Sequence, residues 1–343
     1  MINSFESLQY LVNLVSGKKN ISIAEISLDT VLKIAKTNDL LLATCDVLGD
    51  FVDIPFSYQE PYQQLKCLEA NSLDILKSFL EQCKENELPL LTIKSFLPFP
   101  YADSNIDIVA VKAKAIEQYR NQIKHLGFVR QRNLADIREP DKEMYYHLER
   151  GRFDRTFPKL HLHRSISWNG VVYINPKQVW QRHQLIMVKG VAIPVPSPED
   201  ELLIMAAHAM FENKYISLHE LIYLNWLTTQ ALDWSYIIQT ARKGFWDDAL
   251  RYFLNIAYSL GDILEMNILI KIPLSDSAQL PPFSFPLIMP LSQTFKSAMI
   301  KLWGDVRHGR LTEFPRQIFT YLLVDCFWMY RKAWQRNKVS FEL

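Results

Sequence analysis

Paired cysteines and long apolar runs are absent from this 343-residue sequence. Its four cysteines, Cys45, Cys67, Cys83 and Cys326, are scattered, with no CxxC pair and no spacing typical of disulfides. We expect them to be buried thiols in a reducing compartment. No apolar run reaches the roughly 18 residues that a membrane-spanning helix needs. The best candidate, residues 318–329, is shorter and contains an aspartate.

The N-terminus and the overall charge exclude further classes of protein. The first basic pair, Lys18–Lys19, follows the apolar residues, whereas a secretory signal has basic residues first. We therefore expect a cytoplasmic protein. Lys and Arg number 38 against 37 Asp and Glu, so the formal charge of +1 gives no global attraction toward nucleic acid or acidic membranes. Neither a nucleic-acid partner nor an oligomeric state is indicated.

The common signatures of nucleotide binding and hydrolysis are also missing. There is no GxxxxGK[ST] and no GxGxxG, so the ordinary glycine-rich cradles for phosphate are absent. HExxH and GxSxG do not occur either. Nucleotide chemistry in this chain would need a different arrangement.

Three segments of the sequence, 1–87, 88–195 and 196–343, differ in the spacing of their apolar residues. The first has helical spacing of its apolar residues, as in Phe5–Val15, and is expected to be a helical N-terminal module. The last is expected to be a helical C-terminal domain. It begins with a helix-start signature in which Ser197 is the N-cap, proline follows, and two acids occupy the first turn.

The middle segment alternates strand-like and helical patterns. Lys112–His125 has helical spacing and ends before Gly127, and Asn169-Gly170 is a pair that tight hairpins favour. We expect an α+β fold: a small mixed sheet with helices on one face, flanked by helical N-terminal and C-terminal regions. The predicted strands are 89–93, 106–111, 128–132, 144–148, 159–167 and 171–174.

The C-terminal segment ends in a stretch that mixes aromatic and basic residues. Phe327–Arg336 includes Arg331 and Lys332 beside two tryptophans. It could stack on bases or lie on a membrane surface, or it could pack its aromatic side chains on the protein with a solvated basic edge. The predicted helices of the segment are 199–212, 216–230, 234–243, 246–266, 291–303 and 315–336.

A candidate chemical site lies where the second predicted strand begins. Asn105 and Asp107 are two residues apart, so a strand directs both side chains to the same side. Carboxylates placed in this way, with a third on a neighbouring strand, can hold Mg²⁺ and a nucleoside triphosphate. The cation neutralises the charge that develops during phosphoryl transfer.

Three motifs carry a resemblance to a known superfamily. Asn105–Asp107 before an apolar strand is similar to the DxD of nucleotidyltransferases, and His161-Leu-His163 resembles the strand that holds their third acid, often as DxH. PSPEDELLIMAAH, residues 196–208, is similar to their SPEDxLLxxxxH helix start. Residues 88–230 thus resemble the nucleotidyltransferase superfamily, most closely its broad, uncharacterised family from bacteria and archaea.

The resemblance implies an activity and roles for individual residues. The activity is transfer of a nucleoside monophosphate from an NTP to an unknown acceptor, with Mg²⁺ or Mn²⁺ as cofactor. Asp107 and Asp103 would bind the metal together with His161, and Asn105 would complete the catalytic set with the two aspartates. The residues assigned to the nucleotide are Lys94, Ser95, His163 and His208.

Three positions depart from the family pattern. Lys94-Ser95 stands where the family has a Gly-Gly or Gly-Ser turn, and the lysine would contact phosphate as a point charge. Asn105 stands in place of an acid and brings no charge. His161 offers nitrogen, which suits Zn²⁺ or Mn²⁺ better than Mg²⁺. Asp103 is the carboxylate that could compensate.

Other interpretations of these residues remain open. Asp103 and Asn105 could cap a turn and a strand. The two strand histidines and His208 could be structural, hydrogen-bonded side chains, and Lys94 could extend from a partly buried position toward solvent. The alternative function is a catalytically degenerate member that binds a nucleotide or a protein partner without turnover.

Overall fold

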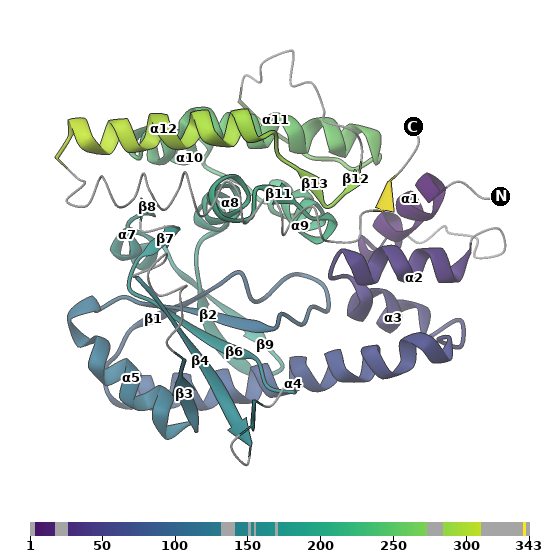
Figure 1. The fold of residues 1–343 in the computed structure, drawn as a ribbon, viewed down its shortest axis with the longest axis horizontal. Coiled ribbons are helices and arrows are strands. Elements are labelled where there is room, and N and C mark those ends of the chain that lie inside the picture. Colours follow the sequence, from purple (N-terminus) through teal and green to yellow (C-terminus); the bar gives the residue numbers. More distant parts are fainter. Residues whose placement is uncertain are drawn as a thin grey trace. The chain divides into compact units, whose positions relative to one another are not determined.

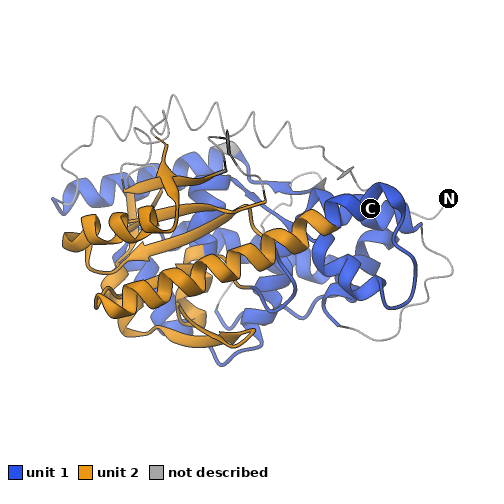
Figure 2. Ribbon diagram, turned by 90° about the horizontal axis from the view of Figure 1, so that it is seen from below, with its two compact units in different colours: residues 1–62, 97–101, 205–343 blue, residues 63–96, 102–204 orange. Residues whose placement is uncertain are grey.

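The computed structural model separates the chain into two compact units (Figure 2). Unit 1 comprises residues 1–62, 97–101 and 205–343, and unit 2 comprises residues 63–96 and 102–204. The three-segment division made from the sequence stays a prediction. The residues that the structure describes are 4–17, 27–131, 141–149, 152–153, 156–168, 171–272, 284–309 and 339–340.

The N-terminal part of unit 1 is helical, as its apolar spacing predicts. Helices α1 (Ser4–Val15), α2 (Leu28–Thr37) and α3 (Leu41–Leu48) pack on one another. Ser27 is the N-cap of α2, and its side chain accepts a hydrogen bond from the backbone N–H of Thr30. Buried leucine, isoleucine and valine side chains fill the space between these helices.

Unit 2 is built on a mixed sheet of six strands (Figure 1). The order is β1-β2-β6-β4-β3, with β5 paired to β4. Strands β2 and β6 are parallel, and the other pairs are antiparallel. This confirms the predicted α+β class with a small mixed sheet. The strands are β1 (Leu90–Ile93), β2 (Asn105–Ala110), β3 (Phe128–Arg130), β4 (Lys142–Glu149), β5 (Arg152–Phe153) and β6 (Lys159–His163).

One face of this sheet carries the core of unit 2. Helix α4 (Phe56–Glu85) and helix α5 (Ile116–His125), which follows a short 3₁₀ turn, contribute buried apolar side chains to the same cluster as the strands. Side chains alternate along a strand, so Ile106 and Ile108 of β2 belong to this cluster while their neighbours point to the other face. Gly127 after α5 has φ of +83°, as expected at C′.

Further strands and the helix α7 follow in unit 2. The predicted strand 159–167 is two strands, β6 and β7 (Ile166–Trp168), and β7 pairs with β8 (Val171–Ile174) across the predicted hairpin, whose tip lies outside the described residues. Helix α7 (Pro176–Gln181) and the hairpin β9 (Gln184–Val188) and β10 (Val191–Val195) were not predicted.

Helix α8 (Pro198–Ala207) begins where the sequence predicts it. Ser197 is its N-cap and accepts a hydrogen bond from the Asp200 backbone N–H. The predicted helix 199–212 changes at His208 into a π-helical segment, His208–Asn213. The later elements are β11 (Tyr215–Ile216), α9 (Leu218–Thr228), α10 (Trp234–Lys243), α11 (Asp247–Ile263), β12 (Ser284–Phe285), β13 (Leu287–Ile288), α12 (Leu291–Arg307) and β14 (Val339–Ser340).

Two predictions for the C-terminus fall where the structure gives no description. Helix 315–336 and the aromatic and basic stretch Phe327–Arg336 lie outside the described residues. Within the described part of the chain, every helix is too short or too polar to cross a membrane.

Candidate active site

Strands β2 and β6 bring three polar side chains to the face of the sheet opposite the α4–α5 core. Because the two strands are parallel and in register, Asp107 lies beside His161, and the residue after next on β6 is His163. All three residues are buried, with only 3–7% of their surfaces exposed. Alternation along the strand predicted this orientation for Asp107, and the register explains why residues 54 and 56 positions away meet it.

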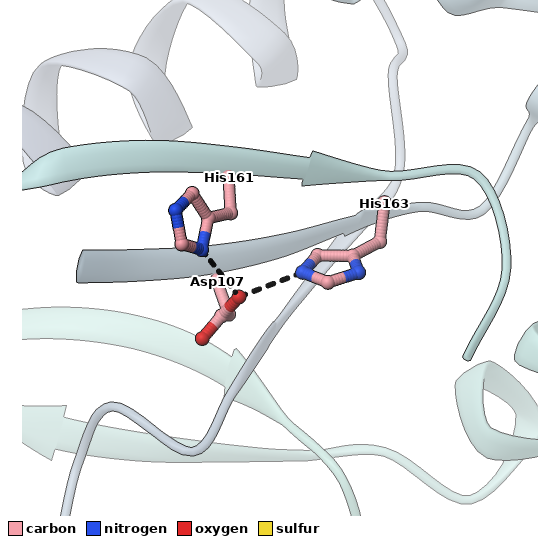
Figure 3. Close-up of side chains that lie close together, drawn as sticks. All are labelled: Asp107, His161 and His163. Atoms are coloured by element: carbon pink, nitrogen blue, oxygen red, sulfur yellow. Dashed lines mark hydrogen bonds and ion pairs between the residues drawn. The ribbon is translucent and has the colours of Figure 1, made fainter. Parts of the chain in front are cut away.

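The carboxylate of Asp107 is shared between the two imidazoles (Figure 3). Its Oδ1 lies 3.1 Å from His161 Nδ1 and 2.6 Å from His163 Nε2. A carboxylate only accepts, so both nitrogens donate to it. Each side chain offers one ligand atom, and these atoms lie within 4.8 Å of one another. Among the described residues, these three form the group that could hold a metal ion.

Lys94 lies against the other oxygen of the same carboxylate. Its Nζ is 3.3 Å from Asp107 Oδ2. Lys94 directly follows β1 and has φ of +59°, a left-handed conformation that glycine adopts without steric cost. The turn therefore keeps the backbone conformation of a glycine turn, and the lysine adds an ammonium to it.

The charge state of the site follows from these contacts. Burial raises the pKa of the Asp107 carboxyl, but Lys94 and the hydrogen bonds from both histidines outweigh it and hold that pKa well below its usual range. Burial, together with nearby Lys142, lowers the pKa of His161 to about 4. At neutral pH the site thus combines a charged carboxylate with an ammonium and a neutral His161.

A divalent cation fits this donor set. One carboxylate and two imidazoles are common metal ligands, and they converge here without rearrangement of the strands. A cation bound by the nitrogens that face Asp107 would replace the protons of these hydrogen bonds. His161 Nε2 is buried and has no hydrogen-bond partner within the described structure. A buried polar atom without a partner is rare in proteins and calls for a ligand, ion or water.

Asp103 and Asn105 make contacts with each other and are not part of this group. Asp103 Oδ1 accepts from the Asn105 backbone N–H at 3.2 Å, and the Asn105 side-chain amide lies 3.4 Å from the same oxygen. These local contacts are the ones expected if Asp103 and Asn105 cap a turn. Ser95 also has a local partner, because its hydroxyl donates to the Ile93 carbonyl. Of the predicted turn pair, Lys94 contacts Asp107, whereas the Ser95 hydroxyl bonds to the backbone of β1.

Glu201 is a site residue that the sequence did not reveal. It lies in the first turn of α8 and is only 7% exposed. Burial raises its pKa to about 8, although the Lys94 ammonium and a backbone hydrogen bond from Lys94 both act to lower it. Glu201 occupies the variable position of the SPEDx motif, so the motif gave no signal for it. Lys94 therefore connects Glu201 to Asp107.

His208 belongs to unit 1 and has its own polar surroundings there. Its Nε2 lies 3.1 Å from Glu212 Oε2 and its Nδ1 lies 3.7 Å from Glu220 Oε1. Burial raises the pKa of Glu220, but His208, His219 and the Ser217 backbone lower it to about 2 overall. Glu220 also forms a capping box with Ser217 at the start of α9. These contacts are those of a partly buried, hydrogen-bonded histidine, and 15% of the His208 side chain is exposed.

Comparison with known proteins supports the resemblance seen in the motifs. Residues 104–261 match the model of a family described as uncharacterised nucleotidyltransferase, a stretch that includes Asp107, both strand histidines and the SPED helix start. No curated protein and no solved structure matches the chain. Residues 104–261 are therefore similar to the uncharacterised nucleotidyltransferase family, as the motifs predicted.

Proposed function

We propose that this protein transfers a nucleoside monophosphate from an NTP to an acceptor hydroxyl or phosphate with the help of a divalent cation. The observation that carries the proposal is the convergence of Asp107, His161 and His163 on two neighbouring strands, within the stretch that matches the nucleotidyltransferase family. In the reaction, the acceptor oxygen attacks the α-phosphorus. The bond from that phosphorus to the bridging oxygen breaks, pyrophosphate leaves with the electron pair, and a hydroxyl acceptor loses its proton to solvent.

Each residue of the site has a role that its contacts support. Asp107, His161 and His163 would hold the cation, which when bound would offset negative charge on the phosphates. His163 thereby moves from the nucleotide, where the sequence assigned it, to the metal group. Asp103 is satisfied locally, so we do not assign it to the metal.

Lys94 is the residue of this site best suited to the triphosphate. Its side chain is 17% exposed, and its ammonium already lies beside the proposed metal group. It could exchange its contact with Asp107 Oδ2 for a phosphate oxygen, since both are anionic acceptors. Contacts of Ser95 and His208 with the nucleotide stay predictions from the resemblance.

A second function, nucleotide binding without turnover, is favoured by one specific observation. Asn105 replaces the first acid, and its amide interacts with Asp103 instead of joining the metal group. With His161 in place of the third acid, a single carboxylate remains among the three predicted acid positions of the family. Loss of negative charge at these positions weakens the hold on a hard cation.

Label transfer separates the two functions. Purified protein is incubated with NTPs labelled at the α-phosphate, with Mg²⁺ or Mn²⁺ and a cell extract as the source of acceptor. We expect transfer by the native protein and a loss of about 100-fold in Asp107→Asn, because the only charged ligand is removed. Asp74→Asn, an exposed carboxylate of α4, is the matched control and should keep full activity.

Two outcomes would contradict the proposal. Transfer that survives in Asp107→Asn removes Asp107 from the reaction. Nucleotide binding by the native protein, with no transfer under either metal, supports the degenerate function instead. Thermal unfolding of each variant shows whether the fold is retained.

A further inference from the structure

We infer that the Asp107–His161–His163 site prefers first-row transition-metal ions such as Zn²⁺, Co²⁺ and Mn²⁺ to Mg²⁺. This inference deepens the proposed function by naming the class of cation. It is carried by the chemistry, burial and charge of the residues on this face of the sheet.

The donor atoms are the first reason. Two of the three ligands are imidazole nitrogens, and only Asp107 offers oxygen. Imidazole suits Zn²⁺ and other borderline ions, whereas Mg²⁺ takes carboxylates, phosphates and water. The described residues supply no second carboxylate to this group, and Asp103, the nearest candidate in sequence, is held in a turn by Asn105.

The contacts of the single carboxylate are the second reason. Asp107 Oδ1 faces both imidazoles, and Oδ2 faces the ammonium of Lys94. Lys94 therefore already neutralises the one negative charge of the site. A hard cation gains its affinity mainly from negative charge, so it loses more here than an ion that forms strong bonds to nitrogen.

Burial is the third reason. The three ligand side chains expose at most 9% of their surfaces. Mg²⁺ dehydrates reluctantly and usually keeps several of its waters. A buried site with few oxygen atoms offers little to replace them, whereas Zn²⁺ is commonly bound by three protein side chains and one further ligand.

Direct metal binding tests the inference without relying on activity. Co²⁺ is titrated into the metal-free native protein while the visible absorption of the ion is followed, and Zn²⁺, Mn²⁺ or Mg²⁺ is then added as competitor. We expect a saturable Co²⁺ signal that Zn²⁺ abolishes and Mn²⁺ reduces. Mg²⁺ at about 100-fold excess should leave it unchanged.

One variant tests whether His163 binds Co²⁺, and a second tests whether the preference for Zn²⁺ over Mg²⁺ can be reduced. His163→Gln should weaken Co²⁺ binding by about tenfold or more, while His125→Gln, on the exposed side of α5, should not change it. His161→Asp restores an acid at the family position. It should lower Zn²⁺ affinity and raise Mg²⁺ affinity, each by about tenfold.

Several results would overturn the inference. These are displacement of Co²⁺ by an equal concentration of Mg²⁺, Co²⁺ binding that is unchanged in His163→Gln, or no saturable Co²⁺ binding at all. Failure of the proposed function has a different signature. Selective binding of Zn²⁺ or Co²⁺ without label transfer keeps this inference and removes the reaction, and label transfer with Mg²⁺ alone does the reverse.

Discussion

The ammonium of Lys94 lies 3.3 Å from Asp107 Oδ2, although Lys94 stands in a turn whose backbone conformation favours glycine. A lysine with φ of +59° bears a steric cost that glycine avoids. The ion pair with a buried carboxylate offsets that cost. The contact explains how this chain departs from the glycine turn expected at this place and still keeps the turn's conformation beside β1.

Substitution of Lys94 separates the backbone cost from the ion pair. Lys94→Gly and Lys94→Ala both remove the ammonium, but only glycine relieves the left-handed strain. We expect the glycine variant to be more stable than the alanine variant by about 1 kcal/mol. Urea unfolding measures the difference. Equal stability of the two variants would show that residue 94 is not left-handed in solution.

Much of this site could be predicted from the sequence because its signals are local. The alternation in β2 correctly oriented Asp107, and the spacing in His161-Leu-His163 placed two histidines on one face of β6. The apolar residues between them fixed which face is the core. Strand-period patterns therefore indicated the sheet and the shared face of Asp107, His161 and His163, whose role in a site stays a prediction.

The rest depended on contacts between residues far apart in the sequence. Glu201 meets Lys94 across more than 100 residues, and no spacing rule connects them. The β9–β10 hairpin was missed because Lys189-Gly190 is not one of the usual turn pairs, although both residues have positive φ as a tight hairpin turn requires. Asp103 was assigned to the metal because sequence distance could not reveal its bond to the Asn105 backbone.

Glu143 on the helix-covered side of the same sheet should be important for stability. It is fully buried and accepts hydrogen bonds from Arg120 and Tyr145 at 2.9 and 2.7 Å and from Arg164 at 2.5 Å. Glu143→Gln removes the charge that these arginines face. We expect a loss of about 3–5 kcal/mol in the free energy of unfolding, because a buried ion pair is broken from one side.

Glu117, a second carboxylate that contacts Arg120, provides the control for Glu143→Gln. Glu117 also pairs with Arg120, but its side chain is 71% exposed. Glu117→Gln should cost less than about 1 kcal/mol. If both substitutions have the same small effect in chemical unfolding, the Glu143 cluster does not stabilise the sheet.

The Glu143 cluster also has a predictable response to acid. Burial raises the Glu143 pKa, but hydrogen bonds from Arg120, Arg164 and Tyr145 outweigh it and lower the pKa from 4.5 to about 2. Since the folded-state value is depressed, the stabilisation is present above pH 4.5 and is lost as the pH falls toward 2. The stability difference between the native protein and Glu143→Gln should shrink over that window.

His161 gives a pH dependence in a different window. Burial lowers its pKa from 6.5 to about 4. Between these values the unfolded chain binds a proton that the folded protein does not, so stability should fall as the pH is lowered from 6.5 to 4. His161→Gln should flatten this part of the profile, measured by thermal or urea unfolding. The control is His125→Gln, at an exposed position of α5, which should retain the native slope. A native slope in His161→Gln would mean that His161 is not buried as a neutral imidazole.

Ionisation of Glu201 should make folding stability depend on pH in the opposite direction from His161. Burial raises its pKa from 4.5 to about 8, despite the opposing Lys94, so the folded protein holds a proton that the unfolded chain has released. Its contribution to stability is present below pH 4.5 and is lost as the pH rises through 8. Glu201→Gln keeps the shape and the acceptor for the Lys94 backbone but cannot ionise, so it should become more stable than the native protein as the pH rises toward 9.

Unfolding curves of the native protein and Glu201→Gln at pH 5 and pH 9 measure this difference, with Glu117→Gln as the exposed control. A native protein that gains stability relative to Glu201→Gln at pH 9 would show instead that the ionised carboxylate is stabilised by the ammonium of Lys94.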